Sequence, residues 1–460
     1  MEKKSSVIVL AGYFYILLPI LIFFAGYCNI LTSFIGILMI CIFGLLLCKN
    51  TPQLWIPSNR KEWALIMLIL IISLVWVYSS GIGALVFQNL DHNCRNPIFE
   101  HLVENTWPVL SADKQYILTY YIGFWLPSAL IGKIFNSIQI GYYFQIIWAT
   151  FGVFLTFYYI LASLKKKVLW PVFLFIFFSG MDLLGSLQLY GFRSFEPFEI
   201  TKHLEWYYPG YQFSSFTTQL YWVFNQAIPA WVITLLLFHQ KDSKNIIFLY
   251  SCMFLFSTIP AIGIFPFVIY WSFKNNINSI FTLQNFLGGS FILMVSYTYL
   301  SNNIAGGHIT FQFISASAFM WWFILFFMLE IGFYILYIIR YCCKEILLYI
   351  CLFCFLVYPF IHIGYSDDFC MRATIPALII IFILITQTIG NSEFYKNKLN
   401  LSILIFLLFI GSFTPMHEIT RTVIMTSHGI TKAKADLGFE NFFGYTKNSK
   451  FLKYFGKNNY

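Results

Sequence analysis

The sequence predicts an all-α integral membrane protein, built as a polytopic bundle of transmembrane helices. Apolar residues make up 59% of the 460 positions and charged residues only 10%, against roughly 25% charged in a soluble domain. Runs of about 20 apolar residues recur along the whole chain, each long enough to cross a ~30 Å hydrocarbon core as a helix. Apolar and polar positions do not alternate, which disfavours a membrane β-barrel.

The charge pattern indicates a lipid bilayer as the partner and not nucleic acid. The net charge is +9, and most lysines lie in short loops between apolar runs. Such loops are typical of the cytoplasmic side of a membrane protein, so we place the N-terminus inside. We expect no cleavable signal peptide, because the chain re-enters the membrane almost directly after its first apolar run.

The first three crossings are expected near residues 7–25, 30–47 and 63–80. Basic residues between the second and third crossings mark an inside loop, so the third helix delivers the chain to the outside. A long outside loop then begins at Gly81.

Two apolar stretches, about 116–134 and 139–162, precede the basic triplet Lys165–Lys167. If both stretches crossed, the triplet would lie outside, against the positive-inside rule. We therefore expect 116–134 to be a juxtamembrane or re-entrant helix, and Pro127 and Lys133 within it agree with this interpretation.

Nine further crossings complete a bundle of about thirteen. Two of them, 245–258 and 261–272, are short and flank Pro260, which suggests a broken hairpin covered by other helices. The nine are expected near 169–187, 218–238, 245–258, 261–272, 286–300, 318–338, 345–363, 373–390 and 399–413.

These crossings divide the chain into two parts. A transmembrane domain covers 1–413, with large outside loops at about 81–138 and 188–217. A C-terminal tail covers 414–460 and is placed outside by helix parity, either as a small cap or as a partner-binding segment.

The first outside loop carries Asp91 and His92 where the third helix leaves the membrane. Asn96-Pro97 has the pattern of an N-cap followed by proline at the first helical position, so we expect a helix over 97–106. Its apolar side chains form one stripe, which predicts a helix lying in the interface plane. The candidate substrate-binding residues that face away from this stripe are Glu100, His101 and Glu104.

The second outside loop combines charged and aromatic residues. Rigid aromatic rings beside carboxylates suit a sugar-binding groove, because sugar rings stack while their hydroxyls need acceptors. Trp and Tyr are also common at every membrane interface, which is the simpler interpretation. The candidate substrate-binding residues of this face are Asp182, Arg193, His203, Glu205 and Trp206.

The third outside loop places Asp367, Asp368 and Arg372 at the outer end of one helix. Arg372 could bind a phosphate through its forked donors. Alternatively, Asp368 and Arg372 are a structural pair four residues apart on one helix. Glu330 is expected at mid-membrane depth, either as a functional group or as a neutral, hydrogen-bonded carboxyl.

No motif fixes a metal or cofactor site. HExxH, GxSxG, a phosphate-binding glycine loop and paired CxxC sequences at zinc spacing are absent from the sequence. His101 and His203 could join carboxylates at a divalent metal, although no fixed spacing on one element supports this. We therefore expect no required cofactor.

These residues resemble the GT-C class of integral membrane glycosyltransferases. The shared plan has an acidic residue just outside an early transmembrane helix, in a first large outside loop with juxtamembrane helices. Asp91 and the stretches 97–106 and 116–134 match that plan. Strings similar to bacterial membrane proteins of this type are DHNCRNPIFEHLVENTWPV, YYIGFWLPSALIGKIF, SGMDLLG and DDFCMRATIPAL.

The resemblance covers residues 85–390 in patches, and two features depart from it. Two extra apolar segments precede the helix that ends at Asp91. Asp91-His92-Asn93 also stands where the family has an acid-x-acid pair, which argues against a metal-dependent site.

The resemblance implies sugar transfer from a polyprenyl-phosphate donor to a hydroxyl of a glycan or glycolipid. The protein would lie in a bacterial inner membrane with its active face outside. Asp91 would take the acceptor proton, with His92 as a substitute base or as an orienting group. The leaving phosphate could be stabilised by Arg372, Arg193 or Lys202. A purely structural role, with Asp91 capping the start of the loop, is the competing interpretation.

Two other functional classes remain open. An O-antigen polymerase or ligase would depend on Arg193, His203 and Arg372 more than on Asp91. A lipid or sugar transporter predicts internal repeats and charges lining a path at mid-membrane. The two halves show no repeat, and Glu330 is nearly the sole charge expected at that depth.

Overall fold

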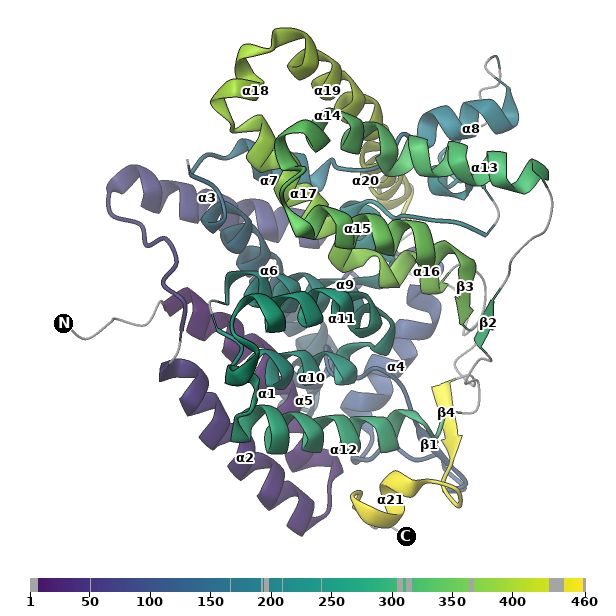
Figure 1. Cartoon of the computed structure of the whole chain (residues 1–460). Coiled ribbons are helices and arrows are strands. Elements are labelled where there is room, and N and C mark those ends of the chain that lie inside the picture. Colours follow the sequence, from purple (N-terminus) through teal and green to yellow (C-terminus); the bar gives the residue numbers. More distant parts are fainter. Residues whose placement is uncertain are drawn as a thin grey trace.

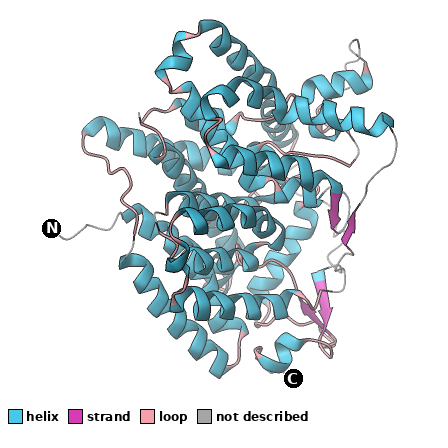
Figure 2. Ribbon diagram, in the orientation of Figure 1, coloured by secondary structure: helices cyan, strands magenta, loops and turns pink. Residues whose placement is uncertain are grey.

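The chain folds as a helical bundle with very little sheet (Figures 1 and 2). The computed structural model describes residues 7–429 and 442–457 except 50, 166, 192, 194–197, 209, 241, 304–308, 312–316 and 364–367. The all-α fold class expected from the composition is confirmed.

The helices are named in chain order. The first half contains α1 (Val7–Tyr27), α2 (Ile30–Lys49), α3 (Arg60–Ser79), α4 (His92–Glu104), α5 (Leu126–Ile134), α6 (Ile138–Ala162), α7 (Trp170–Ile176), α8 (Asp182–Tyr190), the 3₁₀ turn η2 (Leu204–Tyr207) and α9 (Phe216–His239). The second half contains α10 (Ile246–Phe256), α11 (Thr258–Lys274), η3 (Ile277–Ile280), η4 (Gln284–Gly289), α12 (Ser290–Leu300), α13 (Ser317–Phe327), η5 (Met328–Gly332), α14 (Phe333–Cys342), α15 (Ile346–Val357), η6 (Tyr358–Phe360), α16 (Asp368–Ala373), α17 (Ile375–Ile389), α18 (Ser392–Lys396), α19 (Lys398–Gly411), α20 (Phe413–Ser427) and α21 (Lys450–Tyr454).

Within the described residues, seven helices are long and apolar enough to cross a membrane. They agree with the membrane class expected from the sequence, whereas the number of crossings stays a prediction. The seven are Val7–Tyr27, Ile30–Lys49, Arg60–Ser79, Ile138–Ala162, Phe216–His239, Trp321–Cys342 and Lys398–Ser427.

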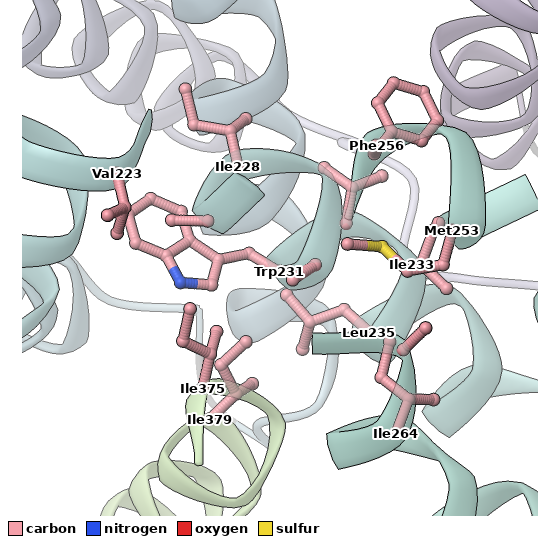
Figure 3. Close-up of a cluster of buried hydrophobic side chains, with 14 of the residues drawn as sticks. Val223, Ile228, Trp231, Ile233, Leu235, Met253, Phe256, Ile264, Ile375 and Ile379 are labelled. Carbon is pink, nitrogen blue, oxygen red and sulfur yellow. The ribbon is translucent and has the colours of Figure 1, made fainter. Parts of the chain in front are cut away.

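Helix α9 forms the centre of the core. Every side chain from Phe216 to Leu237 except that of Trp222 is buried, as expected for a helix that is covered on all sides. The Trp231 ring stacks parallel to the ring of Trp76 in α3, with 6.0 Å between centroids. Figure 3 shows Trp231 surrounded by aliphatic side chains of α9 and α17.

The stretch 116–134 does not form a continuous helix. It begins as strand β1 (Tyr116–Leu118) and becomes helical only in the nine residues of α5. Its middle is held away from helical geometry because the Gly123 amide donates to the carbonyl of Leu255, at 3.2 Å. The expected helix over the whole stretch is therefore wrong, because only its last nine residues are helical. That the stretch does not cross the membrane stays a prediction.

The stretch 169–187, expected as one crossing, is broken between α7 and α8. At the break, the Met181 amide donates to the Leu329 carbonyl at 3.0 Å instead of continuing its own helix. Gly180 permits this approach, because a Cβ there would lie 2.2 Å from Oε2 of Glu330. The break brings the start of α8 against η5.

The N-terminal start of α1 and the basic loops lie at one end of the bundle. The Tyr159 hydroxyl donates to the Ile8 carbonyl at 2.8 Å, and the Tyr158 hydroxyl donates to the Trp55 carbonyl. Lys167 lies with its ammonium 5.8 Å from the Trp55 ring centroid. The end of α6 therefore meets the start of α1.

Both small sheets lie at the opposite end, along the right-hand side of Figure 1. Strand β1 pairs antiparallel with β4 (Phe443–Tyr445), and β2 (Ile309–Phe311) with β3 (Ile361–Ile363). The Asn29 amide donates to the Phe455 carbonyl at 2.7 Å. Residues 442–457 thus lie at the same end as the first large loop.

The chain after residue 413, expected as a separate tail, begins with α20. This helix continues from α19 and packs against α3, α8 and α9. It brings two charged residues into the interior, which are described below.

Candidate functional site

Two groups of polar side chains lie at the end of the bundle that carries the sheets. We call the first the paired-arginine cluster, formed by Asp91, Arg95, Tyr120, Asp368 and Arg372. We call the second the buried acid cluster, formed by Asp182, His203, Glu205, Glu330, Glu418 and Arg421.

In the paired-arginine cluster, Asp91 lies directly before the first turn of α4. Its Oδ2 accepts a hydrogen bond from Nη2 of Arg95 at 2.8 Å. The Arg95 side chain is 5% exposed and that of Asp91 is 35% exposed. The helix begins five residues before the Pro97 start expected from the sequence, because this pair and the buried His92 extend it by more than a turn.

The second pair repeats the first on α16. Oδ1 of Asp368 lies 2.9 Å from Nη2 of Arg372, and the two side chains are 39% and 13% exposed. The structural i, i+4 pair, one of the two interpretations of these residues, is thus present. Asp367, the other acid expected at this helix end, lies outside the described residues.

The two pairs come together although they are far apart in the chain. Arg372 interacts electrostatically with Asp91 as well as with Asp368. Tyr120 lies close enough to interact with both guanidinium groups. The two loops that carry these pairs, both expected outside the membrane, therefore form one polar site.

Both arginines retain unused donors. Among the described residues, Nε and Nη1 of Arg95 and Nε of Arg372 are buried without a hydrogen-bond partner. Buried polar groups are nearly always hydrogen-bonded, so orphaned charged donors need an explanation. The Arg95 guanidinium also lies 5.9 Å from the Phe224 ring centroid.

His92, expected as an alternative base, faces the protein interior. It is buried, its ring stacks on Phe224 at 5.5 Å, and its Nδ1 lies 3.2 Å from Nε2 of Gln88. Burial, together with the Arg95 cation, lowers the pKa of His92 to about 3. A neutral imidazole in this position can support the fold beneath Asp91 but does not reach the partly exposed side of the site.

The remaining candidates on α4 lie toward its other end, about 15 Å along the helix axis from Asp91. Glu100 accepts a hydrogen bond from the Tyr142 hydroxyl at 2.9 Å. His101 lies 3.0 Å from Nδ2 of Asn105, and Glu104 is exposed. The helix therefore carries these three residues away from Asp91 and Arg95.

In the buried acid cluster, Glu418 of α20 is the central acceptor. Its Oε1 lies 2.9 Å from Nδ1 of His203 and 2.8 Å from Nη1 of Arg421. Its Oε2 accepts from the Trp222 indole at 3.0 Å. The α20 helix thus holds the second outside loop against α9.

Glu205 stands on the other side of His203, with 3.8 Å between its Oε2 and the imidazole Nε2. Its oxygens accept from the Gln212 side chain at 2.7 Å and from the Ser215 amide at 2.9 Å. Burial alone would lower the pKa of His203, but the carboxylates of Glu418 and Glu205 outweigh it and raise that pKa. The cluster therefore favours an imidazolium.

Asp182 and Glu330 form the deep side of the buried acid cluster. Oδ2 of Asp182 accepts from Ser179 and from Thr414, each at 2.7 Å, and Oε1 of Glu330 accepts from Tyr207 at 2.7 Å. The π-helical turn η5 contains Glu330, and such turns are frequent at functional sites. The two carboxyl groups interact electrostatically.

The exposed members of the second loop do not form an enclosed site. The Trp206 indole is exposed and stands edge-on to His203, with ring centroids 4.8 Å apart. Arg193 is exposed as well. This position fits both the sugar-stacking and the membrane-interface interpretations of the sequence.

A cavity of about 280 Å³ lies between α8, η2 and α13. Its wall is mostly apolar, and Tyr207 connects it to the buried acid cluster through the bond to Glu330. The lining residues are Gly185, Gln188, Leu189, Tyr207, Tyr208, Trp322, Leu325 and Phe326.

No group of three or more His, Cys, Asp or Glu side chains in the described part of the chain is arranged to hold a metal ion. His101 and His203, the two histidines considered for a metal, lie on separate elements with separate partners.

Comparison of the chain with protein-family models, with curated proteins and with solved structures finds no match.

Three residues of these clusters did not stand out in the sequence. Arg95 lies in the first large loop without being singled out there, and Glu418 and Arg421 lie in the region expected to be a tail. A signal for Arg95 was available: Asp91 and Arg95 have the same four-residue spacing as Asp368 and Arg372. Nothing in the local sequence links Glu418 to His203.

Proposed function

We propose that the protein is a membrane glycosyltransferase that transfers a sugar from a polyprenyl-phosphate donor to an acceptor hydroxyl at the outer membrane face. The observation that carries the proposal is the position of Asp91. It is a partly exposed carboxylate before an amphipathic helix, and it lies beside two arginines from different loops.

The chemistry assigns one task to each group. The acceptor oxygen attacks the anomeric carbon and forms a new C–O bond, while the bond from that carbon to the phosphate oxygen breaks. Asp91 takes the proton of the acceptor hydroxyl. The leaving phosphate gains negative charge, which Arg372 and Arg95 stabilise. A single displacement of this kind inverts the anomeric configuration.

The proposed alternative base and one proposed cation fit this scheme less well. His92 is buried and its pKa is about 3, so Asp91 is the stronger candidate. Lys202 is engaged elsewhere, with its ammonium 5.3 Å from the Tyr190 ring centroid.

A lipid or sugar transporter is the second candidate, and Asp182 beside Glu330 is the observation that favours it. Paired carboxyls deep in a helical bundle are a feature of proton and ion pathways. An O-antigen polymerase or ligase that depends on His203 receives less support, because His203 is buried between Glu418 and Glu205.

The test is a transfer assay on purified protein in proteoliposomes, with a panel of radiolabelled polyprenyl-phosphate sugars and nucleotide sugars as controls. We expect transfer from lipid-phosphate donors alone. Transfer from nucleotide sugars alone would contradict the proposed donor class. No transfer from any donor, together with proton-dependent solute uptake, would support the transporter.

A further inference from the structure

We infer that the two Asp–Arg pairs form a binding site for a phosphate group, in which each aspartate occupies its arginine until the phosphate replaces it. The assignment of this phosphate to a lipid-linked sugar rests on the proposed function. The binding site itself rests on the geometry of the paired-arginine cluster.

The two pairs have matching geometry. In each pair an aspartate at the start of a helix bonds to Nη2 of an arginine one turn later, at 2.8 Å in α4 and 2.9 Å in α16. In each pair the arginine is the buried partner and the aspartate the more exposed one. An incoming ligand therefore meets the carboxylates first and the guanidinium groups behind them.

The arginines are not satisfied by their aspartates. A guanidinium has five N–H donors in a planar fork. Within the described residues, two nitrogens of Arg95 and one of Arg372 are buried without a partner. A phosphate oxygen can accept several such bonds, and forked arginine–phosphate bonds are shorter and stronger than neutral ones.

The charges around the site allow an anion to bind once an aspartate is displaced. Each of the two arginines is paired with one aspartate, so a displaced aspartate leaves one guanidinium for the phosphate. Tyr121, which interacts electrostatically with Arg372, bonds at 2.7 Å to the Thr258 hydroxyl in the first turn of α11. A helix N-terminus adds a positive partial charge on this side.

The exchange has a consequence for the proposed reaction. While Asp91 is paired with Arg95, its Oδ2 accepts a hydrogen bond from the guanidinium at 2.8 Å and is occupied by that donor. A phosphate that takes the donors of Arg95 releases Asp91 beside the bound donor. The base is then available only when the phosphate is present.

The experiment is isothermal titration calorimetry on the full chain in detergent. The probes are inorganic phosphate, farnesyl phosphate and uncharged farnesol. Wild type is expected to bind both phosphates and not farnesol. Arg95→Gln and Arg372→Gln should each weaken binding about tenfold or more, whereas Lys450→Gln, which removes an exposed cation on α21, should change it less than about twofold.

The aspartate variants provide the decisive comparison, because they leave both arginines in place. Asp91→Asn and Asp368→Asn remove a competitor of the phosphate, so each should tighten binding about three- to tenfold. Unchanged or weaker binding by both aspartate variants, or no phosphate binding by wild type, would overturn the inference. Arg372→Lys keeps the charge, and a loss intermediate between wild type and Arg372→Gln is expected.

If farnesyl phosphate binds more tightly than inorganic phosphate, the ligand of the site is a lipid phosphate. If the two bind equally, the ligand is a free phosphate. These results are independent of sugar transfer. Tighter binding by Asp91→Asn without transfer from any donor would support the phosphate site and contradict the proposed glycosyltransferase activity. Transfer by wild type without the expected changes in binding would support the glycosyltransferase activity and contradict the exchange of aspartate for phosphate.

Discussion

Replacing Glu418 by glutamine tests the role of the buried acid cluster. The carboxylate accepts three hydrogen bonds, from His203, Arg421 and Trp222, at 2.8 to 3.0 Å. The charged side chains of Glu418, His203 and Arg421 are at most 7% exposed, so water screens their charges only weakly. The change keeps the volume of the side chain and removes its charge.

The expected loss of stability depends on which interactions each partner of Glu418 retains. Removing one member of a buried charge network costs about 3–5 kcal/mol, because the other charges stay buried without compensation. Arg421 keeps its bonds to the carbonyls of Ile200 and Lys202, whereas His203 keeps only the more distant Glu205. We therefore expect Glu418→Gln to lower the free energy of unfolding by about 3 kcal/mol, at the lower end of that range.

The assay is chemical unfolding in detergent micelles, followed by tryptophan fluorescence. Glu393→Gln, an exposed carboxylate on α18, is the matched control and should change stability by less than about 0.5 kcal/mol. A loss below about 1 kcal/mol for Glu418→Gln is what an exposed ion pair gives. That result would show that water reaches the cluster and that its charged side chains do not depend on one another for stability.

Three further predictions concern packing and pH. Gly180→Ala should destabilise the chain by about 1–3 kcal/mol, because its Cβ would lie 2.2 Å from Oε2 of Glu330. Gly390→Ala is the control in the same unfolding assay and should be tolerated, because its Cβ would make ordinary contacts at 3.5 Å. Gly444→Ala should speed amide exchange in β4, since its Cβ would lie 2.2 Å from a backbone oxygen, and unchanged exchange would count against the pairing. The raised pKa of His203 contributes stability that is complete below about pH 6.5 and is lost as pH rises through the folded pKa; unfolding measured from pH 5 to 9 should show that loss, and a flat profile would contradict it.

Composition and apolar run length were sufficient to predict the fold class. α1, α2, α3, α6 and α9 lie within a few residues of the expected crossings, because long apolar runs have few alternatives to a helix. The charge rule predicts that 116–134 does not cross the membrane, and in the structure this stretch is helical only over α5.

The breaks in the helices were not predictable from apolar runs. The interruption between α7 and α8 depends on a backbone bond from Met181 to Leu329, and the bend in 116–134 depends on Gly123 meeting Leu255. Both are contacts between segments far apart in the chain. Local hydropathy carries no information about such contacts.

The candidate site was predicted in part. Asp91, Asp368 and Arg372 were identified as polar residues at helix ends, and they lie in one cluster. Glu100, His101 and Glu104 were grouped with them by sequence proximity, but α4 carries them away from that cluster. Glu418 and Arg421 were missed because a helix near the C-terminus returns them to the second loop.

The initial rate of sugar transfer by Asp91→Asn relative to wild type tests directly whether Asp91 is the general base. Both proteins are measured at the same concentration in proteoliposomes. Asp113→Asn, an exposed acid in the same loop, is the control and should retain the wild-type rate. We predict that Asp91→Asn lowers the rate by about 10²- to 10⁴-fold, the contribution of a general base. A rate within about tenfold of wild type would show that Asp91 is not the base and would contradict the proposed mechanism.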